Sequence, residues 1–186
     1  MSGRIEQEKV SVEMENFVLT IGHSTRPVQE FIALLQENGV SRIIDVRTIP
    51  RSRHNPQFNR DTFPETLAQA GIRYTHMPGL GGLRHARADS PNRGWRNGSF
   101  RGFADYMQTD EFAHNIEQLM EFSSRERVAI MCAEAVPWRC HRSLIADALL
   151  ARGVRVVHIV GKAKRADHEI TPFARIDGVS ITYPAE

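Results

Sequence analysis

Five short segments of the chain have the length and apolar character of buried strands, and helical spacing separates them. The most continuous apolar run, Val128–Ala133, lies within the fourth of these segments. Short apolar runs bounded by turn residues are typical of strands that a sheet buries on both faces. The predicted strands are Phe17–Ser24, Ser41–Val46, Arg73–Met77, Arg127–Glu134 and Val154–Val160.

A helix is predicted after each of the first four strands. In the first helix, Phe31, Leu34 and Leu35 fall on one face, which is the spacing of a half-buried helix. The pattern Thr62-x-x-Glu65 is a capping box at the start of the second. The predicted helices run from Thr25 or Arg26 to Gly39, from Thr62 to Gly71, from Gly102 to Ser124 with a break near Thr109, and from Trp138 to Arg152.

The remaining segments have weaker patterns. The stretch Pro78–Ser99 is rich in glycine, and an irregular loop of about 20 residues in a compact domain is usually functional or mobile. After Gly161 the periodicity fades, although Ile181–Tyr183 fits an edge strand. We expect the polar residues 1–16 to form a flexible N-terminal extension and residues 17–186 to form a single α/β domain.

The alternation of strands and helices predicts the fold class. Apolar strands separated by helices favour a mostly parallel sheet that is covered on both faces. We therefore expect a three-layer, open α/β fold with about five strands and helices on both faces. Five strands are too few for an eight-stranded barrel, so a truncated, barrel-like sheet is the alternative.

Composition sets limits on where the protein works. The chain has no run of about 18 apolar residues, so we expect no transmembrane helix and no membrane partner. The N-terminus lacks the apolar stretch of a signal peptide. Cys132 and Cys140 are the two cysteines, too few for a disulfide framework. A cytoplasmic location is expected.

The basic residues are mostly arginine and are unevenly spread. The chain has 21 arginines and three lysines, and eleven arginines but four acidic residues lie between Arg42 and Arg101. The guanidinium group is a planar fork of donors that matches phosphate and carboxylate. This block therefore favours a phosphate-bearing partner. Solubility with local salt bridges, or the composition of the genome, explains the block equally well.

Polar and titratable residues follow four of the predicted strands where each strand ends. Ligands of open parallel sheets bind beyond the carboxyl ends of the strands, so we expect these residues to converge on one site. A single histidine or aspartate at a strand end is more often structural, and convergence is the informative feature. The candidates are His23, Ser24, Asp45, Arg47, Arg51, His76, Gly81, Gly82, Cys132, Glu134, Cys140, His141 and Arg142.

The segment from Cys132 to Arg142 is the most informative. It runs from a strand through a short loop to the start of a helix, where free N–H groups and the helix dipole favour an anion. Nine residues separate Cys132 from Arg142, too many for the Cys-x5-Arg phosphate loop of phosphatases. Cys140 is either a small buried residue or, in the first helical turn, a thiol of lowered pKa.

A metal site is a weaker interpretation of the same residues. Cys132, Cys140, His141 and His76 offer ligand atoms, but the chain has no paired spacing such as C-x2-C. Adjacent residues such as Cys140 and His141 do not easily direct their side chains at one ion. We expect no metal and no cofactor.

Glu134 is expected near the end of the most apolar strand. An unpaired carboxylate there would be costly, so we expect Glu134 to be ionised and held by Arg47 or Arg142. Its role is either a structural ion pair or a general base or nucleophile.

Five motifs occur in order along the chain. They are Thr20–Ser24; Ile44–Arg47 with Pro50, Arg51 and Ser52; Pro78–Gly82; Phe100–Met107; and Cys132–Glu134 with Cys140–Arg142. Together they resemble the bacterial and archaeal family called domain of unknown function 488 (DUF488), and the resemblance covers the chain from about Phe17 to Gly161. It implies a compact, cytoplasmic α/β domain whose strand-end residues form the site, with no settled activity.

Two functions fit these observations. The first is a hydrolase or transferase acting on a small anionic, phosphorylated or nucleotide-like substrate. The second is a non-catalytic module whose arginines bind nucleic acid or a nucleotide. The residues assigned to catalysis are Glu134, His23, His76 and Cys132; those assigned to ligand binding are Ser24, Asp45, Arg47, Arg51, Gly81, Gly82, Arg101, Cys140, His141 and Arg142.

Overall fold

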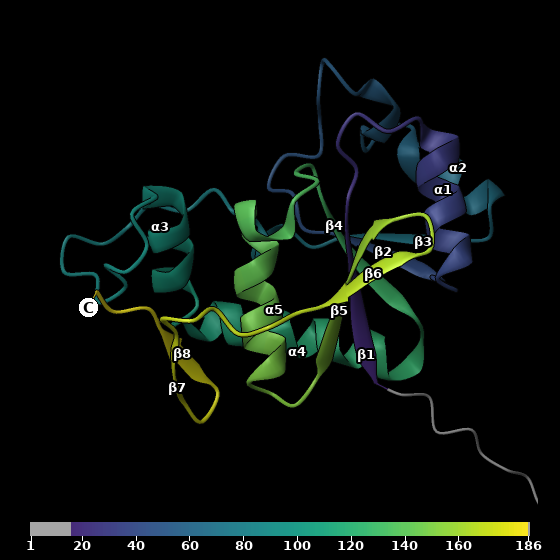
Figure 1. The fold of residues 1–186 in the computed structure, drawn as a ribbon. Coiled ribbons are helices and arrows are strands. Elements are labelled where there is room, and N and C mark those ends of the chain that lie inside the picture. Colours follow the sequence, from purple (N-terminus) through teal and green to yellow (C-terminus); the bar gives the residue numbers. More distant parts are fainter. Residues whose placement is uncertain (1–15, 186) are drawn as a thin grey trace, which may run out of the picture.

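The computed structural model describes residues 16–185 and contains a six-stranded sheet with helices on both faces (Figure 1). The strand order is β3-β2-β4-β1-β5-β6, in which the first five strands are parallel and β6 is antiparallel to β5. The strands are β1 (Phe17–Gly22), β2 (Arg42–Asp45), β3 (Arg73–His76), β4 (Val128–Cys132), β5 (Arg155–Gly161) and β6 (Lys164–Asp167).

Five α-helices and three short 3-10 helices connect or follow these strands within the described residues. All four predicted helical regions are present, and the predicted break near Thr109 is confirmed because its Oγ1 accepts from the Phe112 N–H at 3.2 Å. The helices are α1 (Val28–Glu37), η1 (Pro56–Phe58), α2 (Phe63–Gln69), η2 (Pro78–Leu80), α3 (Gly98–Tyr106), α4 (Asp110–Arg125), η3 (Pro137–Arg139) and α5 (Arg142–Leu150).

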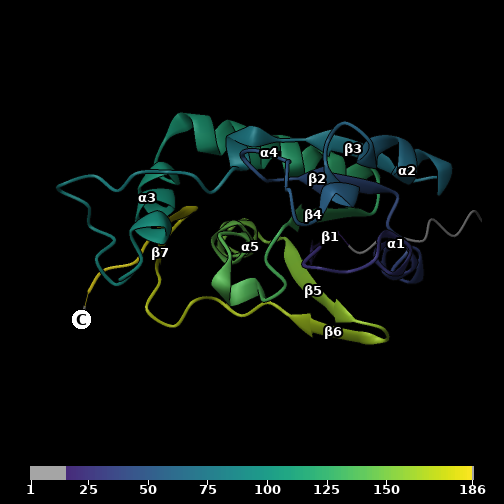
Figure 2. The same ribbon diagram turned by 90° about the horizontal axis from the view of Figure 1, so that it is seen from above.

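Two apolar layers enclose the sheet. Alternate residues of each strand face opposite sides, so Leu19 and Ile21 pack with α1 and α2, whereas Val18 packs with α3, α4 and α5. Figure 2 shows α1 and α5 on opposite sides of β1 and β5. The three-layer α/β fold is confirmed, and the barrel-like alternative is wrong because β3 and β6 are open edges. Among residues 16–185, no helix has both the length and the apolar character needed to cross a membrane.

Several boundaries differ from the sequence prediction. The charged segment after β5 folds back as β6 rather than remaining irregular. The predicted edge strand at Ile181–Tyr183 corresponds to β8 (Ser180–Thr182), which pairs with β7 (Arg175–Asp177) in a separate two-stranded sheet. The predicted extension over residues 1–16 lies outside the described residues except for Asn16. The division of the chain into an extension and one domain stays a prediction.

A buried chain of hydrogen bonds links the sheet to the C-terminal segment. The Asp147 carboxylate accepts from His168 Nε2 at 2.8 Å, and His168 Nδ1 lies 3.0 Å from His158 Nε2. His158 Nδ1 lies 2.6 Å from Thr20 Oγ1. Because the Asp147 carboxylate can only accept, the His168 Nε2–H donates to it. The Tyr183 hydroxyl also donates to Asp147, at 2.8 Å.

The long irregular stretch Pro78–Ser99 is fixed by one buried carboxylate. Asp105 of α3 accepts from Ser90 Oγ at 2.5 Å, from Asn92 Nδ2 at 2.8 Å and from the Arg87 N–H at 2.8 Å. These bonds hold the middle of the stretch, and residues 82, 83, 97 and 99 near its two ends line one pocket.

The helical crossovers that leave the neighbouring strands β1 and β4 run in opposite directions across the sheet. From β1 the chain crosses through α1 to β2 on one side, whereas from β4 it crosses through α5 to β5 on the other. β1 and β4 are neighbours in the sheet. In an open α/β sheet, a crevice forms outside the carboxyl ends of the strands at such a point.

Candidate functional site

A pocket of about 630 Å³ lies beyond the carboxyl ends of β1, β2 and β4. Four segments of the chain form its wall: the turn after β1, the loop after β2, the ends of the irregular stretch before α3, and the segment from β4 to the start of α5. It lies at the switch point that the topology predicts. Its wall consists of His23, Ser24, Thr25, Arg47, Thr48, Ile49, Arg51, Ser52, Asn55, Gly82, Leu83, Asn97, Ser99, Phe100, Cys132, Ala133, Glu134, Ala135, Arg139, Cys140 and His141.

Close packing of two main-chain segments shapes the floor. A Cβ atom on Gly22 would overlap the carbonyl group of Glu134, so only glycine lets the loop after β4 lie against the end of β1. The main chain then pairs across this contact, from the Ser24 N–H to the Ala133 carbonyl at 2.9 Å. Ser24 itself has a left-handed backbone, with φ at 50°. Strained residues of this kind persist where their surroundings hold them in place.

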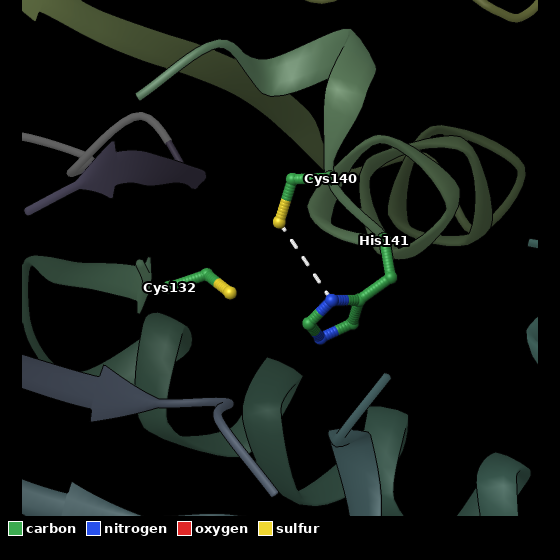
Figure 3. A group of neighbouring side chains, drawn as sticks. All are labelled: Cys132, Cys140 and His141. Atoms are coloured by element: carbon green, nitrogen blue, oxygen red, sulfur yellow. Dashed lines mark hydrogen bonds between the residues drawn. The ribbon is translucent and has the colours of Figure 1, made fainter. Parts of the chain in front are cut away.

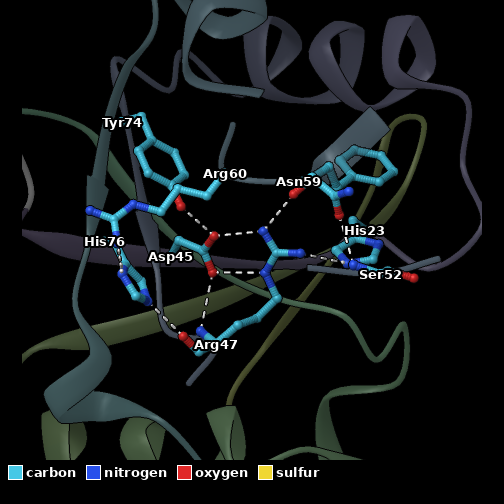
Figure 4. Close-up of polar contacts among 9 residues, drawn as sticks. His23, Asp45, Arg47, Ser52, Asn59, Arg60, Tyr74 and His76 are labelled. Carbon is cyan, nitrogen blue, oxygen red and sulfur yellow. Dashed lines mark hydrogen bonds and ion pairs between the residues drawn. The ribbon is translucent and has the colours of Figure 1, made fainter. Parts of the chain in front are cut away.

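A buried ion pair supports one side of the pocket. Asp45 at the end of β2 is fully buried, and its two oxygens accept from Arg47 Nε at 2.9 Å and Nη2 at 2.6 Å (Figure 4). The Tyr74 hydroxyl donates to the same carboxylate at 2.7 Å. The Arg47 fork is therefore occupied by protein groups, and its charge is balanced by Asp45.

His23 is held as a neutral imidazole. Burial lowers its pKa to about 4, and the nearby Arg47 cation acts in the same direction. The ring stacks on Phe58, with 4.4 Å between centroids, and Nδ1 donates to the Ser24 carbonyl at 2.8 Å. Nε2 therefore carries the lone pair, which faces Arg47 Nη1 at 3.3 Å.

Two cysteines and a histidine converge in another part of the wall (Figure 3). Cys140 Sγ lies 3.7 Å from His141 Nδ1, and one ligand atom from each of Cys132, Cys140 and His141 lies within 4.8 Å of the others. The pKa of the Cys140 thiol is lowered far below its usual value, chiefly because the neighbouring Cys132 thiol stabilises the thiolate. The pKa of Cys132 is raised by the same neighbour and by burial. Both cysteines are free.

Arg142 is a buried cation beneath this cluster. The side chain has no exposed surface, and it donates to Thr20 Oγ1 at 3.1 Å and to the main-chain carbonyl of Glu134. Its Nε has no hydrogen-bond partner among the described residues. Arg142 therefore ties the loop after β4 to β1 and supplies positive charge close to the Cys140 thiolate.

Nine of the predicted site residues share the pocket wall. They come from the ends of β1, β2 and β4, and from the start of the irregular stretch, as the strand-end argument predicts. They are His23, Ser24, Arg47, Arg51, Gly82, Cys132, Glu134, Cys140 and His141. Whether they bind a ligand or take part in catalysis stays a prediction.

Three predicted site residues support the pocket from outside its wall. Asp45 is occupied by Arg47, and Arg142 is covered by the loop that it holds. Gly81 contacts Thr48, where a Cβ atom would clash, so it determines how closely two loops pack. These residues were expected to touch a ligand; instead they position the residues that form the wall.

Two other predicted residues point elsewhere. His76 Nε2 bonds the Arg47 carbonyl at 2.8 Å, and its ring lines a separate groove beside α4. The Arg101 guanidinium donates twice to the Trp95 carbonyl, at 3.1 and 2.9 Å. The structure does not place these two residues in the pocket wall, because the position of a residue along the sequence does not fix the direction of its side chain.

The expected ion pair of Glu134 is absent from the described structure. Strand β4 ends at Cys132, so Glu134 lies in the following loop, exposed to solvent, and its Oε1 accepts from the Val136 N–H at 3.2 Å. Among residues 16–185, neither Arg47 nor Arg142 pairs with its carboxylate. The error came from extending the strand by two residues, which placed an exposed carboxylate in the core.

The start of α5 also differs from the expected anion site. The predicted helix over Trp138–Arg152 is divided into η3 and α5. The N–H groups of Ser143 and Leu144 already bond the carbonyls of Cys140 and His141, at 3.0 and 3.1 Å. Such turn bonds satisfy groups that a helix N-terminus otherwise leaves free. The binding of an anion at this helix start stays a prediction.

Sequence reasoning missed part of the wall. Thr25 and Arg139 adjoin the predicted site residues Ser24 and Cys140 and belong to the same strand-end segments. The others come from loops and helix starts, in which no periodic pattern indicates where a side chain points. The missed residues are Thr48, Ile49, Ser52, Asn55, Leu83, Asn97, Ser99, Phe100, Ala133 and Ala135.

The fold and the pocket together define an α/β protein with a cleft at the switch point of a mostly parallel sheet. The family model described as domain of unknown function DUF488 matches residues 27–149, and the chain belongs to this family. The matched region includes α1 through most of α5. Neither the comparison with curated proteins nor the comparison with solved structures gave a match.

Proposed function

We propose that the pocket binds a small phosphate-bearing ligand, of nucleotide size, and acts on it as a hydrolase or transferase. The main support for this proposal is that two arginines, Arg51 and Arg139, line the pocket wall. Both side chains are exposed, and among residues 16–185 neither guanidinium group has a hydrogen-bond or ion-pair partner. An exposed, unpaired guanidinium in a concave site is suited to phosphate.

The size and the apolar part of the wall support a nucleotide-like ligand. A volume of about 630 Å³ is within the range of small-molecule sites. Ile49 and Leu83 keep 65% and 69% of their surfaces exposed, and Phe100 contributes an aromatic ring to the same wall. These side chains offer a surface for a sugar or base, while the arginines hold the phosphate.

Glu134 is the acidic residue that we assign to the chemistry. Its carboxylate is exposed in the wall of the pocket and is engaged by one main-chain N–H, so an oxygen is free to accept a proton from water or a substrate hydroxyl. His23 is less suited to this role because Arg47 faces its only free nitrogen. An isosteric Glu134→Gln variant that turned over a bound ligand at the wild-type rate would exclude this role.

Replacing either of the two free arginines should weaken ligand binding without unfolding the protein. For adenosine monophosphate, Arg51→Met and Arg139→Met are each expected to lower affinity tenfold or more, since a hydrogen bond to a charged group contributes about 1.5–3 kcal/mol. Isothermal titration calorimetry measures the affinity, and adenosine tests whether the phosphate is needed.

Arg53 offers a matched control. It is an exposed arginine in the same loop as Arg51, and it lies outside the pocket wall. Arg53→Met should bind adenosine monophosphate as wild type does. Equal losses in all three variants would show a general charge effect and would count against the proposed site.

A nucleic-acid-binding module is the second candidate, and Trp138 favours it. This indole is 72% exposed and adjoins Arg139. Proteins that bind single-stranded nucleic acid stack the bases on aromatic rings and bind the backbone with neighbouring cations. Tight binding of a single-stranded oligonucleotide, weakening steeply with salt and lost in Trp138→Ala, would support this alternative over the small-ligand pocket.

A reducing, cytoplasmic location belongs to the same proposal. It is supported by the two free thiols in the pocket wall, one of them with a lowered pKa. Such thiols remain reduced in the cytosol.

A further inference from the structure

We infer that Cys132, Cys140 and His141 form a zinc site with three protein ligands and a fourth position open to the pocket. This inference is independent of the proposed phosphate ligand. It begins from the convergence of three ligand atoms within 4.8 Å of one another, on three residues that all line the pocket. Two thiolates and an imidazole are ligands that zinc prefers.

The backbone explains how two adjacent residues can serve one ion. Cys140 is extended, with φ at −131° and ψ at 146°, whereas His141 has helical angles of −57° and −12°. The chain turns between them, and Figure 3 shows the two side chains converging beside Cys132. The objection drawn from their adjacency in the sequence therefore does not apply.

The imidazole is held in the orientation that a metal ligand needs. His141 Nε2 donates to the Val46 carbonyl at 3.2 Å, which leaves the lone pair on Nδ1, the atom that faces Cys140. A hydrogen bond from the second ring nitrogen to a carbonyl is the usual support of a metal-bound histidine. On its other side the ring packs on Gly82, where a Cβ atom would lie 2.6 Å from Nδ1.

The three ligand atoms need to move only slightly closer together to bind one zinc ion. Zinc bonds of about 2.3 Å to sulfur and about 2.0–2.1 Å to nitrogen place tetrahedral ligands about 3.5–3.8 Å apart. The distance of 3.7 Å from Cys140 Sγ to His141 Nδ1 already fits, and the other two distances must shorten by at most about 1.3 Å. Because the cluster lies in the pocket wall, the fourth position would face water or a ligand there.

The test uses cobalt as a spectroscopic probe of the full-length protein. After chelation and under reducing conditions, one equivalent of Co²⁺ should give a thiolate-to-cobalt charge-transfer band and the strong visible bands of tetrahedral cobalt, and Zn²⁺ should remove both. Cys132→Ser and Cys140→Ser should each lose the charge-transfer band in part and bind zinc more than about a hundredfold more weakly, since even second-shell changes cost 10–100-fold.

Two further measurements do not depend on removing a ligand. Gly82→Ala keeps all three ligands but displaces the His141 ring, and we expect about 10–100-fold weaker zinc binding. In the wild type, zinc should protect both cysteines from alkylation. His114 is an exposed histidine outside the pocket, and the control variant His114→Gln should bind zinc as the wild type does. The absence of a cobalt band together with unprotected thiols would overturn the inference, as would zinc affinity unchanged in Cys132→Ser and Gly82→Ala.

Discussion

Replacing Asp45 with asparagine should lower the free energy of unfolding by about 3–5 kcal/mol, because it leaves the buried Arg47 cation without its counter-ion. The carboxylate accepts two bonds from the Arg47 guanidinium and a third from its main-chain N–H at 3.1 Å, and it is fully buried. An amide would place an NH₂ group against donors. Urea unfolding of wild type and Asp45→Asn measures the difference.

Tyr74→Phe is the matched control for this prediction. It removes one hydrogen bond from the same carboxylate but leaves the ion pair intact, so it should cost about 1 kcal/mol. The double variant Asp45→Asn with Arg47→Met removes both charges and should recover much of the lost stability. If Asp45→Asn cost no more than Tyr74→Phe, the ion pair would not support this side of the pocket.

Acidification should destabilise the protein strongly between pH 6.5 and pH 4. Burial lowers the pKa values of His23 and His158 from 6.5 to about 4, so both are neutral when folded but bind protons when unfolded. Their contribution is complete above about pH 6.5, decreases as the pH falls below 6.5, and is fully lost below about pH 4. Each contributes about 2–3 kcal/mol to the difference in unfolding free energy between pH 7.5 and pH 4.5, or roughly 5 kcal/mol together.

The pH effect can be assigned to individual residues. His23 faces Arg47, with Asp45 and Arg142 nearby, and His158 faces His168 and Thr20. His158→Gln should remove about half of the slope of stability against pH. Exposed His114→Gln should leave the slope unchanged. Equal stability of the wild type at pH 7.5 and pH 4.5 would be inconsistent with two buried, neutral histidines.

The layers of the fold could be predicted from the sequence because burial leaves a periodic pattern. Apolar strands that are covered on both faces form continuous runs, and the helix stripes at Phe31 and Phe112 repeat with helical spacing. The sixth strand could not be predicted in this way. All four residues of β6 are exposed, so its position depends on pairing with β5 rather than on burial.

The position of the site followed from topology, but its composition did not. Residues at strand ends meet because parallel strands end at one edge, which brought His23, Arg47 and Cys132 into one wall. Which side chains face the pocket depends on loop geometry. The turn between Cys140 and His141 and the exposed loop at Glu134 are set by a few backbone angles and by Gly22, which leave no periodic signal.

The central claim is that the pocket at the ends of β1, β2 and β4 binds a phosphate-bearing ligand. Titrating ¹⁵N-labelled protein with adenosine monophosphate, with adenosine as the control, tests it most directly. The account predicts that the largest amide shifts occur at pocket residues such as Ser24, Arg51 and Glu134, and that adenosine alone has little effect. Shifts centred on the groove beside His76 and α4, or equal shifts with adenosine, would contradict it.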